Sequence, residues 1–370
     1  MKILFHIAHP AQYHMFKYVI QNLIAKGHTI KITINTKDIL EQLLIADGIQ
    51  YENILPKHRK YNTKLSTLLT LIKKDIKILH TQIKGNYDLM VGTETALSHV
   101  GWLFRKPALI MDEDDVSVVS VAAKISFPFA THIVSPVTCN LGKWSRKKIS
   151  YNGFQKTAYL HPEYFKPQEE IVSKVINKNE RFFLIRVSGL SAYHDNGIKG
   201  FTEEIVRKII EILTPHGKVL LSTERKLSED LSQYLFKTEV NNIHHFLYYA
   251  DFLIADSQSM CVEAAILGTP SIRFSDFVGK IGVLEELEHK YGLTFGIRVT
   301  QQDKLCEKVN DLLQIKNLRE KWQAKRHKML EDKIDVTSFW TWLIDSYPKS
   351  VSVLQENPDY QNIFSQSWLQ

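Results

Sequence analysis

The sequence predicts an α/β protein built from two doubly wound, Rossmann-like parallel sheets. First, short apolar runs alternate with amphipathic helical segments along both halves of the chain. Second, the segment 151–167 is extended and contains two prolines, as is typical of a linker. Third, 370 residues suffice for two domains of ordinary size. We therefore expect two domains facing a cleft, at 1–160 and 161–333, then a helix at 334–346 and a tail at 347–370.

Composition argues against several classes of protein. The three cysteines have no CxxC spacing, which argues against a disulfide framework and against a structural zinc site. No run of about 20 apolar residues occurs, so a membrane-spanning helix is not expected. The N-terminus is too polar after Ile7 for a signal peptide. We therefore expect a cytoplasmic protein, with the inner face of the membrane as a candidate location.

Charge is distributed unevenly along the chain. Residues 1–165 hold 21 Lys and Arg against 12 Asp and Glu, whereas the remainder holds 26 against 28. This asymmetry indicates that the first half meets an anionic surface or substrate. No helix-turn-helix, zinc-finger or RNA-binding signature accompanies it, so nucleic acid is not an expected partner.

In the first half, the loops that follow predicted strands carry most of the candidate chemistry. His9 and His14 lie after the first strand, and Glu94 lies in the loop after the strand at 87–91. Asp112–Asp115 follows the strand at 107–111, and acids held this close raise one another's pKa, so that one could act as a base near neutral pH. A solvated acidic turn or a helix N-cap explains the same residues equally well. The other predicted strands of this half are 2–7, 29–35, 50–54 and 130–135, and its predicted helices include 15–26, 38–47 and 98–104.

The segment Lys57–Gly85 combines a helical apolar period with many lysines. One interpretation is an ordinary helix on a sheet with a solvated basic face. The other is a face that rests on anionic lipid or holds a phosphate-bearing acceptor. Lys57–Lys84 is thus the candidate contact with an anionic membrane surface.

The second half is predicted to begin with a strand at 182–187, followed by the loop Ser188–Lys199 and a helix at 201–213. Arg225 follows a strand at 218–222, where it could bind phosphate bidentately or form a surface salt bridge. Helices are predicted at 300–313, 317–332 and 335–344. The tail after Pro348 is polar with scattered aromatics, which is typical of a loosely ordered segment.

The stretch Ala250–Phe274, ADFLIADSQSMCVEAAILGTPSIRF, reads as strand, polar turn, helix, stop and strand. Asp256, Ser257, Gln258 and Ser259 offer N-cap chemistry and Met260 completes the turn. Free N–H groups and the positive helix end there would favour a phosphate. Glu263, further along the helix, could accept hydrogen bonds from vicinal hydroxyls. Most strand–turn–helix units are only scaffold, which is the competing interpretation.

The pattern D-S-x-S-x-x-x-E-A-x-x-x-G-x-P within this stretch resembles the nucleotide-sugar signature of GT-B glycosyltransferases and of UDP-N-acetylglucosamine 2-epimerases. Together with Y-x-G-F…Y-L-x-P-x-Y-F-x-P at 151–167, it makes the chain similar to the DUF354 family over nearly all of residues 1–345. The resemblance implies GT-B architecture and a final helix that crosses back to the first domain, although packing on the second domain is equally consistent with the sequence. It also implies that His194 reaches a diphosphate, with Ser188 in the same loop, and that His244, Phe246 and Leu247 contact the base.

The resulting hypothesis is a metal-independent glycosyltransferase that uses a nucleotide-diphosphate sugar, with UDP as the expected nucleotide, to modify a polysaccharide or lipid-linked acceptor. Helix-end N–H dipoles would stabilise the leaving diphosphate, and no cofactor is expected. The base would come from His9, His14, Glu94 or the acids that include Asp112 and Asp114. A 2-epimerase-like enzyme is the alternative, although the E-A-G-x-R-T-type segment expected in that family is replaced here by MDEDDVS. A non-catalytic sugar-nucleotide-binding protein is the third possibility.

Overall fold

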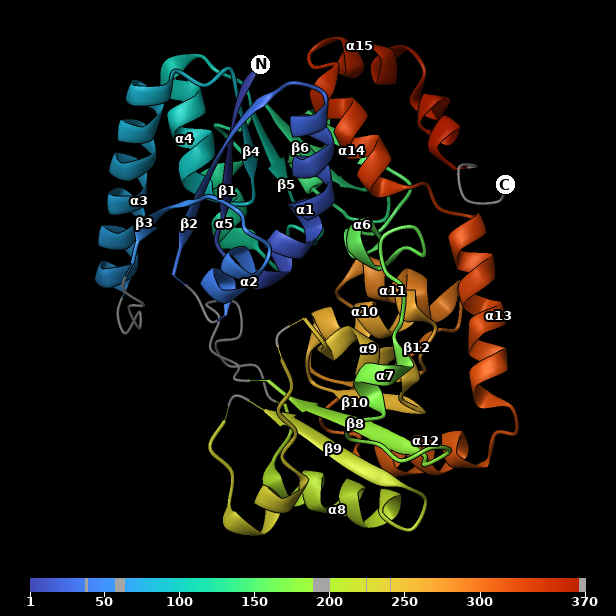
Figure 1. Cartoon of the computed structure of the whole chain (residues 1–370). Coiled ribbons are helices and arrows are strands. Elements are labelled where there is room, and N and C mark those ends of the chain that lie inside the picture. Colours follow the sequence, from blue (N-terminus) through green and yellow to red (C-terminus); the bar gives the residue numbers. More distant parts are fainter. Residues whose placement is uncertain (37–38, 57–63, 189–199, 224, 240, 366–370) are drawn as a thin grey trace. The chain divides into compact units, whose positions relative to one another are not determined.

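The computed structural model describes residues 1–36, 39–56, 64–188, 200–223, 225–239 and 241–365. The chain forms two compact units: unit 1 comprises Met1–Tyr159 with Ile334–Gln370, and unit 2 comprises Leu160–Lys333. Each unit is a parallel sheet flanked by helices (Figure 1). The predicted α/β class with two doubly wound parallel sheets is therefore confirmed.

Unit 1 is organised around a seven-stranded parallel sheet in the order β3-β2-β1-β4-β5-β6-β7. The winding reverses between β1 and β4, so the loops after these two strands leave toward opposite faces. In open α/β sheets a ligand crevice forms at the carboxyl ends of the strands at such a reversal. The strands are β1 Lys2–Ile7, β2 Thr29–Asn35, β3 Glu52–Leu55, β4 Leu89–Gly92, β5 Ala108–Met111, β6 His132–Pro136 and β7 Lys148–Tyr151.

Alternating side chains of β1 fill the two faces of this sheet. Leu4 joins a core cluster with residues of α3, α4 and α5. Phe5 points to the other face, where its ring meets Phe16 of α1 at 5.4 Å, and Phe16 meets Trp340 of α14 at 6.2 Å. The helix predicted at 334–346 thus packs on α1 within unit 1. The helices of unit 1 are α1 Pro10–Ala25, α2 Leu40–Ala46, α3 Lys64–Gly85, α4 Thr95–Phe104, α5 Ser120–Ser126, α6 Thr157–Leu160, α14 Val336–Asp345 and α15 Lys349–Glu356, with 3₁₀ turns at Gly142–Lys147 and Pro358–Phe364.

The C-terminal tail is ordered up to residue 365, so the prediction of a loosely ordered segment is wrong there. Helix α15 and the 3₁₀ turn that follows it lie beside α14. Trp342 of α14 packs against Tyr360 at 5.0 Å and against Phe364 at 5.6 Å. The scattered aromatics therefore attach the tail to unit 1, because burying aromatic surface offsets the cost of ordering the chain.

Unit 2 has a five-stranded parallel sheet in the order β12-β11-β10-β8-β9. Its winding reverses between β8 and β10, which places the loops after these strands at the expected ligand position. The strands are β8 Phe182–Val187, β9 Lys218–Thr223, β10 Phe252–Ala255, β11 Ser271–Phe274 and β12 Thr294–Ile297; the helices are α7 Glu169–Val172, α8 Glu203–Leu213, α9 Ile243–Tyr249, α10 Gln258–Leu267, α11 Gly282–His289, α12 Gln302–Gln314 and α13 Leu318–Glu331, with a 3₁₀ turn at Glu229–Tyr234.

Candidate functional site

The start of α10 lies at the winding reversal of unit 2. All four residues of β10 are buried, and the chain turns directly from this strand into the helix. Ser257 is the N-cap, and its hydroxyl accepts from the Met260 N–H at 3.4 Å. The N–H groups of Gln258 and Ser259 have no acceptor within the helix, because the first turn of any helix lacks them. The turn therefore presents donors and the positive helix end at one point, as an anion requires.

Asp256, which precedes this turn, connects it to the two flanks of the loop after β8 and to Arg225. Its buried carboxylate accepts from the Ser188 N–H at 2.6 Å and from the Phe201 N–H at 3.3 Å. Arg225 pairs with the same carboxylate at 3.3 Å and donates to the carbonyl oxygens of Ser188 and Phe201. Burial raises the pKa of Asp256 despite these donors. The structure thus brings Ser188, Arg225 and Asp256 together in one network that fixes both flanks of the loop after β8.

Glu263 lies in the second turn of α10 and faces His244 of α9. Their closest atoms, His244 Nε2 and Glu263 Oε1, are 3.5 Å apart, and the two side chains are largely buried. Phe246 and Leu247 are fully buried instead, with the Phe246 ring packed against Phe182 and Phe236. If α9 contacts a base, His244 offers a polar side chain at the level of Glu263, whereas Phe246 and Leu247 belong to the core. His194, the other residue expected near a diphosphate, lies outside the described residues.

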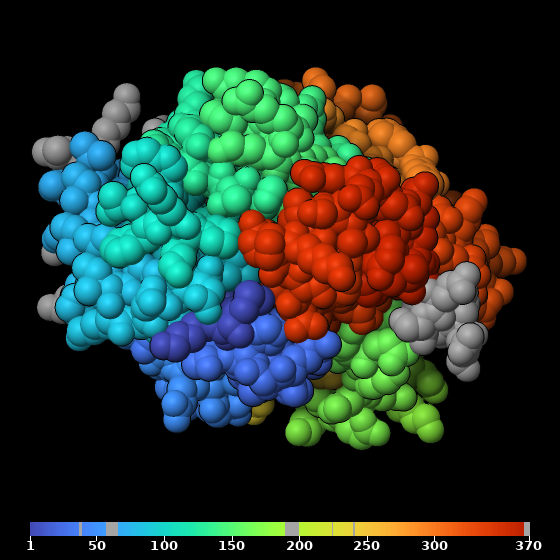
Figure 2. Space-filling view, turned by 90° about the horizontal axis from the view of Figure 1, so that it is seen from above, coloured from blue at the N-terminus to red at the C-terminus, as the bar shows by residue number. Residues whose placement is uncertain are grey.

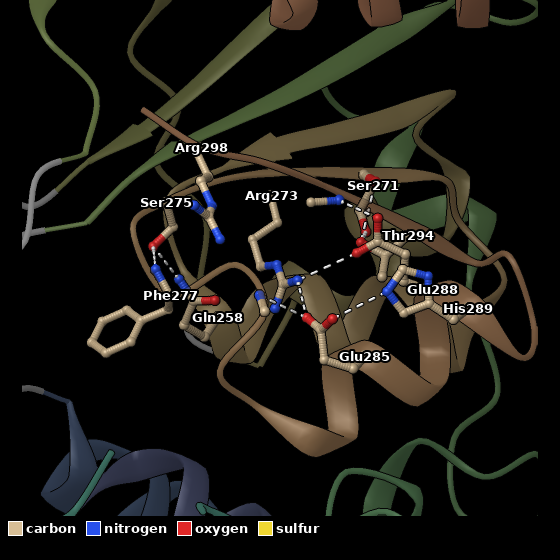
Figure 3. Close-up of polar contacts among 12 residues, drawn as sticks. Gln258, Ser271, Arg273, Ser275, Phe277, Glu285, Glu288, His289, Thr294 and Arg298 are labelled. Atoms are coloured by element: carbon tan, nitrogen blue, oxygen red, sulfur yellow. Dashed lines mark hydrogen bonds and ion pairs between the residues drawn. The ribbon is translucent and has the colours of Figure 1, made fainter. Parts of the chain in front are cut away.

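A buried arginine network, which the sequence reasoning missed, supports the far side of this turn (Figure 3). Arg273 of β11 is completely buried, and its Nη2 donates to Glu285 at 3.0 Å and to Glu288 at 3.3 Å. The same two carboxylates accept from the N–H groups of Gly279 and Gly296, so the network ties β11, β12 and α11 together. A Cβ on Gly296 would stand 2.8 Å from Arg273 Nη2, which explains the glycine there.

Gln258 links the start of α10 to the loop after β11. Its side-chain Nε2 donates to Ser275 Oγ at 2.8 Å, and Ser275 Oγ also accepts from the Phe277 N–H at 3.2 Å. The Gln258 Oε1 atom is buried and receives no hydrogen bond from any described residue. For the Arg273 network, the sequence did offer a signal. It has a charged residue inside the apolar run Ser271–Phe274, followed by two glutamates spaced three residues apart on a helix.

In unit 1 the acidic loop follows β5 at the carboxyl edge of the sheet. Burial, together with the neighbouring Asp114 and Glu113 carboxylates, raises the pKa of Asp112 to about 8. Asp112 Oδ1 accepts from the Asp114 N–H at 2.9 Å. Asp115 is buried and caps the segment after β6 by accepting from the Asn140 N–H at 2.7 Å. The four acids therefore differ: Asp115 is structural, whereas Asp112 titrates where a general base is useful.

Polar groups from the end of β7 surround this loop. The Glu113 carboxylate pairs with Lys156 and accepts from the Gln155 N–H at 3.1 Å. The Tyr151 hydroxyl is fully buried, and burial together with the nearby Glu113 raises its pKa well above the usual range. Neither this hydroxyl nor Gln155 Nε2 has a hydrogen-bond partner among the described residues. Two buried donors thus accompany the titratable carboxylate, and the sequence reasoning identified neither.

The remaining unit 1 candidates lie at the winding reversal between β1 and β4. His9 is the N-cap of α1, and its Nδ1 accepts from the Ala11 N–H at 3.1 Å. Glu94 is the N-cap residue of α4 and pairs with Lys74 at 2.7 Å. Gln12 and Thr93 join the two loops through a 2.5 Å hydrogen bond. His14 is one turn further along α1, where its ring stacks on Tyr159 at 5.4 Å.

The described residues contain no group of three or more His, Cys, Asp or Glu side chains arranged to hold a metal ion. Within the same ranges, no helix combines the length and the apolar character that crossing a membrane requires.

Comparison with known proteins identifies relatives at two levels. The sequence profile described as "Protein of unknown function (DUF354)" matches residues 1–337. A search of curated proteins finds no match. Among solved structures, the MnaA–UDP co-structure from S. aureus is similar with a TM-score of 0.69 at 13% identity, covering 95% of this chain and 98% of that one. UDP-GlcNAc 2-epimerase from Methanocaldococcus jannaschii gives 0.63 at 14% identity, covering 89% and 99%.

A third solved structure, the glycotransferase of kitacinnamycin, gives a TM-score of 0.60 at 10% identity and covers 93% of this chain and 98% of that one. At these identities the likeness concerns the fold. It establishes GT-B architecture for the two parallel-sheet units.

Proposed function

Because the chain belongs to the DUF354 family and has GT-B architecture, we propose that it is a glycosyltransferase that uses a nucleotide-diphosphate sugar. The observation that carries this proposal is the capped, donor-rich start of α10 at the winding reversal of unit 2. An anion-binding turn at this point of an open α/β sheet is where a nucleotide diphosphate is expected. UDP is the proposed nucleotide, since solved relatives are named for UDP or UDP-GlcNAc.

In the proposed donor half-site the diphosphate lies over the Ser257–Met260 turn, against the N–H groups of Gln258 and Ser259. Glu263, held beside His244, accepts hydrogen bonds from the ribose hydroxyls. Asp256 and Arg225 do not contact the diphosphate in this proposal, because Asp256 is paired with Arg225 and with the Ser188 N–H at one flank of the loop after β8. The fixed N–H dipoles stabilise the charge that develops on the leaving diphosphate, so we propose a metal-independent transfer.

We propose Asp112 of unit 1 as the general base that deprotonates the acceptor hydroxyl. Its pKa of about 8 is close to the working range of a base, whereas Glu94 is paired with Lys74 and His9 serves as a helix cap. The acceptor is proposed to be a polysaccharide or a lipid-linked glycan, which agrees with the excess of cationic residues in the first 165 positions. Turnover is then expected to rise with pH through about 8, because the base must be ionised.

A 2-epimerase-like activity is the second candidate. It is favoured by the similarity to UDP-GlcNAc 2-epimerases along nearly the whole chain, and it would use the same donor half-site. The acidic loop after β5 would then act on the sugar itself. A binding protein without turnover is the third candidate, in which the donor half-site functions and the acids of unit 1 are dispensable.

One set of measurements separates these candidates. UDP binding is measured by calorimetry, and the protein is then incubated with several UDP-sugars, with and without membrane extract. UDP released only with an acceptor supports transfer, a C2 epimer formed without acceptor supports epimerisation, and binding without turnover supports the binding protein.

Matched variants test the donor-binding residue and the proposed general base separately. Glu263→Ala is expected to weaken UDP binding by at least about tenfold, since hydrogen bonds to a charged group contribute about 1.5–3 kcal/mol. Glu211→Ala, an exposed glutamate of α8, should leave affinity unchanged. Asp112→Asn should keep UDP affinity and lose about a hundredfold or more in turnover. Full UDP affinity in Glu263→Ala, or no binding of any uridine nucleotide, would overturn the donor site.

A further inference from the structure

The outward face of α3 is apolar, which is the reverse of an ordinary surface helix. Leu68, Leu69, Ile72, Ile76 and Ile83 follow one another at helical spacing and are 44–62% exposed. The opposite side of the helix packs on the sheet and buries Thr70, Ile78, Thr81 and Gln82. Helices on globular proteins normally direct their apolar stripe inward, so this second stripe has another purpose.

Lysines line one edge of this apolar stripe. Lys73, Lys77 and Lys84 are exposed and form no ion pair with any described residue. Lys74, which lies on the side of the helix that faces α4, is instead paired with Glu94. The helix therefore presents an apolar face and an adjoining uncompensated cationic edge to solvent, as helices that lie in a membrane interface do.

The neighbouring helices α4 and α5 extend the apolar surface. The pairs Lys74–Glu94 and Asp75–His99 hold α3 and α4 side by side. In Figure 2 the light-blue atoms of α3 and the cyan atoms of α4 adjoin at the surface of unit 1. Helix α4 ends with the exposed residues Trp102, Leu103 and Phe104, followed by Arg105, and α5 exposes Val121, Lys124 and Ile125.

Residues at the C-terminal end of α4 line two hollows of unit 1, and Ile125 of α5 lines the smaller of them. The larger, of about 990 Å³, is lined by Trp102, Leu103, Arg105, Lys106 and Phe129 among others. The smaller, of about 420 Å³, lies between Trp102, Leu103, Ile125, Phe129 and His99. Ten of the eighteen large hydrophobic residues exposed in the described part of the chain come from α3, α4 and α5. Soluble monomers rarely gather so much apolar surface unless it binds a partner.

We propose that the outward faces of α3, α4 and α5, here called the α3–α5 face, bind an anionic lipid bilayer. The apolar side chains would enter the acyl boundary, with Trp102 at the headgroup level that tryptophan prefers. The lysine edge would meet anionic headgroups. In a symmetric contact with a second copy, each copy would present this same cationic face to the other, whereas anionic headgroups neutralise it.

Vesicle flotation tests this proposal without any substrate, so its outcome is independent of the proposed activity. The full chain is mixed at low salt with phosphatidylcholine vesicles or with vesicles that also contain phosphatidylglycerol. We expect flotation with the anionic vesicles and a loss of binding as salt increases. Lys73→Glu/Lys77→Glu/Lys84→Glu should weaken partitioning at least tenfold, since each basic residue near an anionic surface contributes about fivefold.

Matched variants distinguish binding through the α3–α5 face from nonspecific binding through other charged or apolar surface residues. Trp102→Ser/Leu103→Ser should reduce flotation, while Ile45→Ser, at an equally exposed apolar position of α2, should not. Lys174→Glu/Lys178→Glu in unit 2 should also bind as the unaltered chain does. Circular dichroism reports whether each variant is folded, and light scattering reports whether it is monomeric. Absence of flotation by the unaltered chain, or a dimer that dissociates in the α3 variant, would overturn the proposal.

Discussion

Asp112 follows β5 in unit 1 and Asp256 follows β10 in unit 2, so each carboxylate lies at the carboxyl end of a parallel strand with neighbours on both sides. Both backbone N–H groups extend the sheet ladder, to Val134 O at 3.0 Å and to Arg186 O at 3.3 Å. Burial raises the pKa of both side chains. The backbone setting of the two residues is therefore nearly the same.

Their side-chain partners differ. Asp256 receives two backbone N–H groups and the Arg225 guanidinium, so its charge is compensated within the protein. Asp112 accepts from the Asp114 N–H but forms no ion pair with a cationic side chain among the described residues, and the neighbouring Glu113 and Asp114 carboxylates oppose its ionisation. A strand-end carboxylate with donors around it positions loops, whereas one among other acids is available for proton transfer. The contrast agrees with the proposal that unit 2 binds the nucleotide and unit 1 supplies the base.

Removing Asp256 is the largest expected perturbation of stability. Asp256→Ala leaves the Ser188 and Phe201 N–H groups without their acceptor and removes the carboxylate that compensates the Arg225 charge, so we expect a loss of about 3 kcal/mol or more in the free energy of unfolding. Urea unfolding of the full chain measures it. Asp251→Ala is the matched control, because the Asp251–Arg181 pair is partly exposed and should contribute about 1 kcal/mol or less. Equal, small losses in both variants would show that Asp256 does not hold the turn.

The pH dependence of the free energy of unfolding tests the raised pKa of Asp112. The pKa of Asp112 is raised from about 4 in an unfolded chain to about 8 in the fold, so its contribution to stability is fully present below about pH 4 and is lost as pH rises through about 8. Asp112→Asn removes this loss. Between pH 5 and pH 9 the stability difference should shift in favour of the variant by more than about 1 kcal/mol.

Asp88 in the same unit provides the control for that measurement. The backbone N–H of Lys2 lowers the pKa of Asp88, so its contribution is present above the unfolded pKa and is lost only as pH falls. The difference between the unaltered chain and Asp88→Asn should therefore be constant from pH 5 to pH 9. A flat difference for Asp112→Asn as well would contradict a raised pKa at Asp112.

The fold and the α10 motif could be predicted from the sequence because both depend on local patterns. Buried parallel strands are read as short apolar runs, and Ser257 and Gly268 mark the two ends of α10 as a cap and a left-handed stop. Roles that depend on distant partners could not be predicted. Arg225 is 31 residues from Asp256, and Glu285 and Glu288 lie 12 and 15 residues from Arg273.

Dependence on distant partners also explains why two residues expected to contact a nucleotide base lie in the core instead. Phe246 and Leu247 lie in a segment that adjoins the motif, but the sequence does not show which side of α9 faces the core. Packing decides it: His244 faces Glu263, and Phe246 faces Phe182. Likewise, the buried Tyr151 hydroxyl is recognised only once β7 is placed beside β6 and the acidic loop.

The smallest expected effect concerns Ser257, the N-cap of α10. It tests whether the hydroxyl only holds the turn or binds the ligand directly. Ser257→Ala removes the acceptor for the Met260 N–H and should cost about 1 kcal/mol of stability. UDP affinity should fall by less than tenfold, because the N–H groups of Gln258 and Ser259 are retained on a loosened turn. Ser257→Thr keeps the hydroxyl and should restore both quantities. If Ser257→Ala abolished UDP binding while leaving stability unchanged, the hydroxyl would be a direct ligand contact, and the helix end would contribute less than its backbone donors suggest.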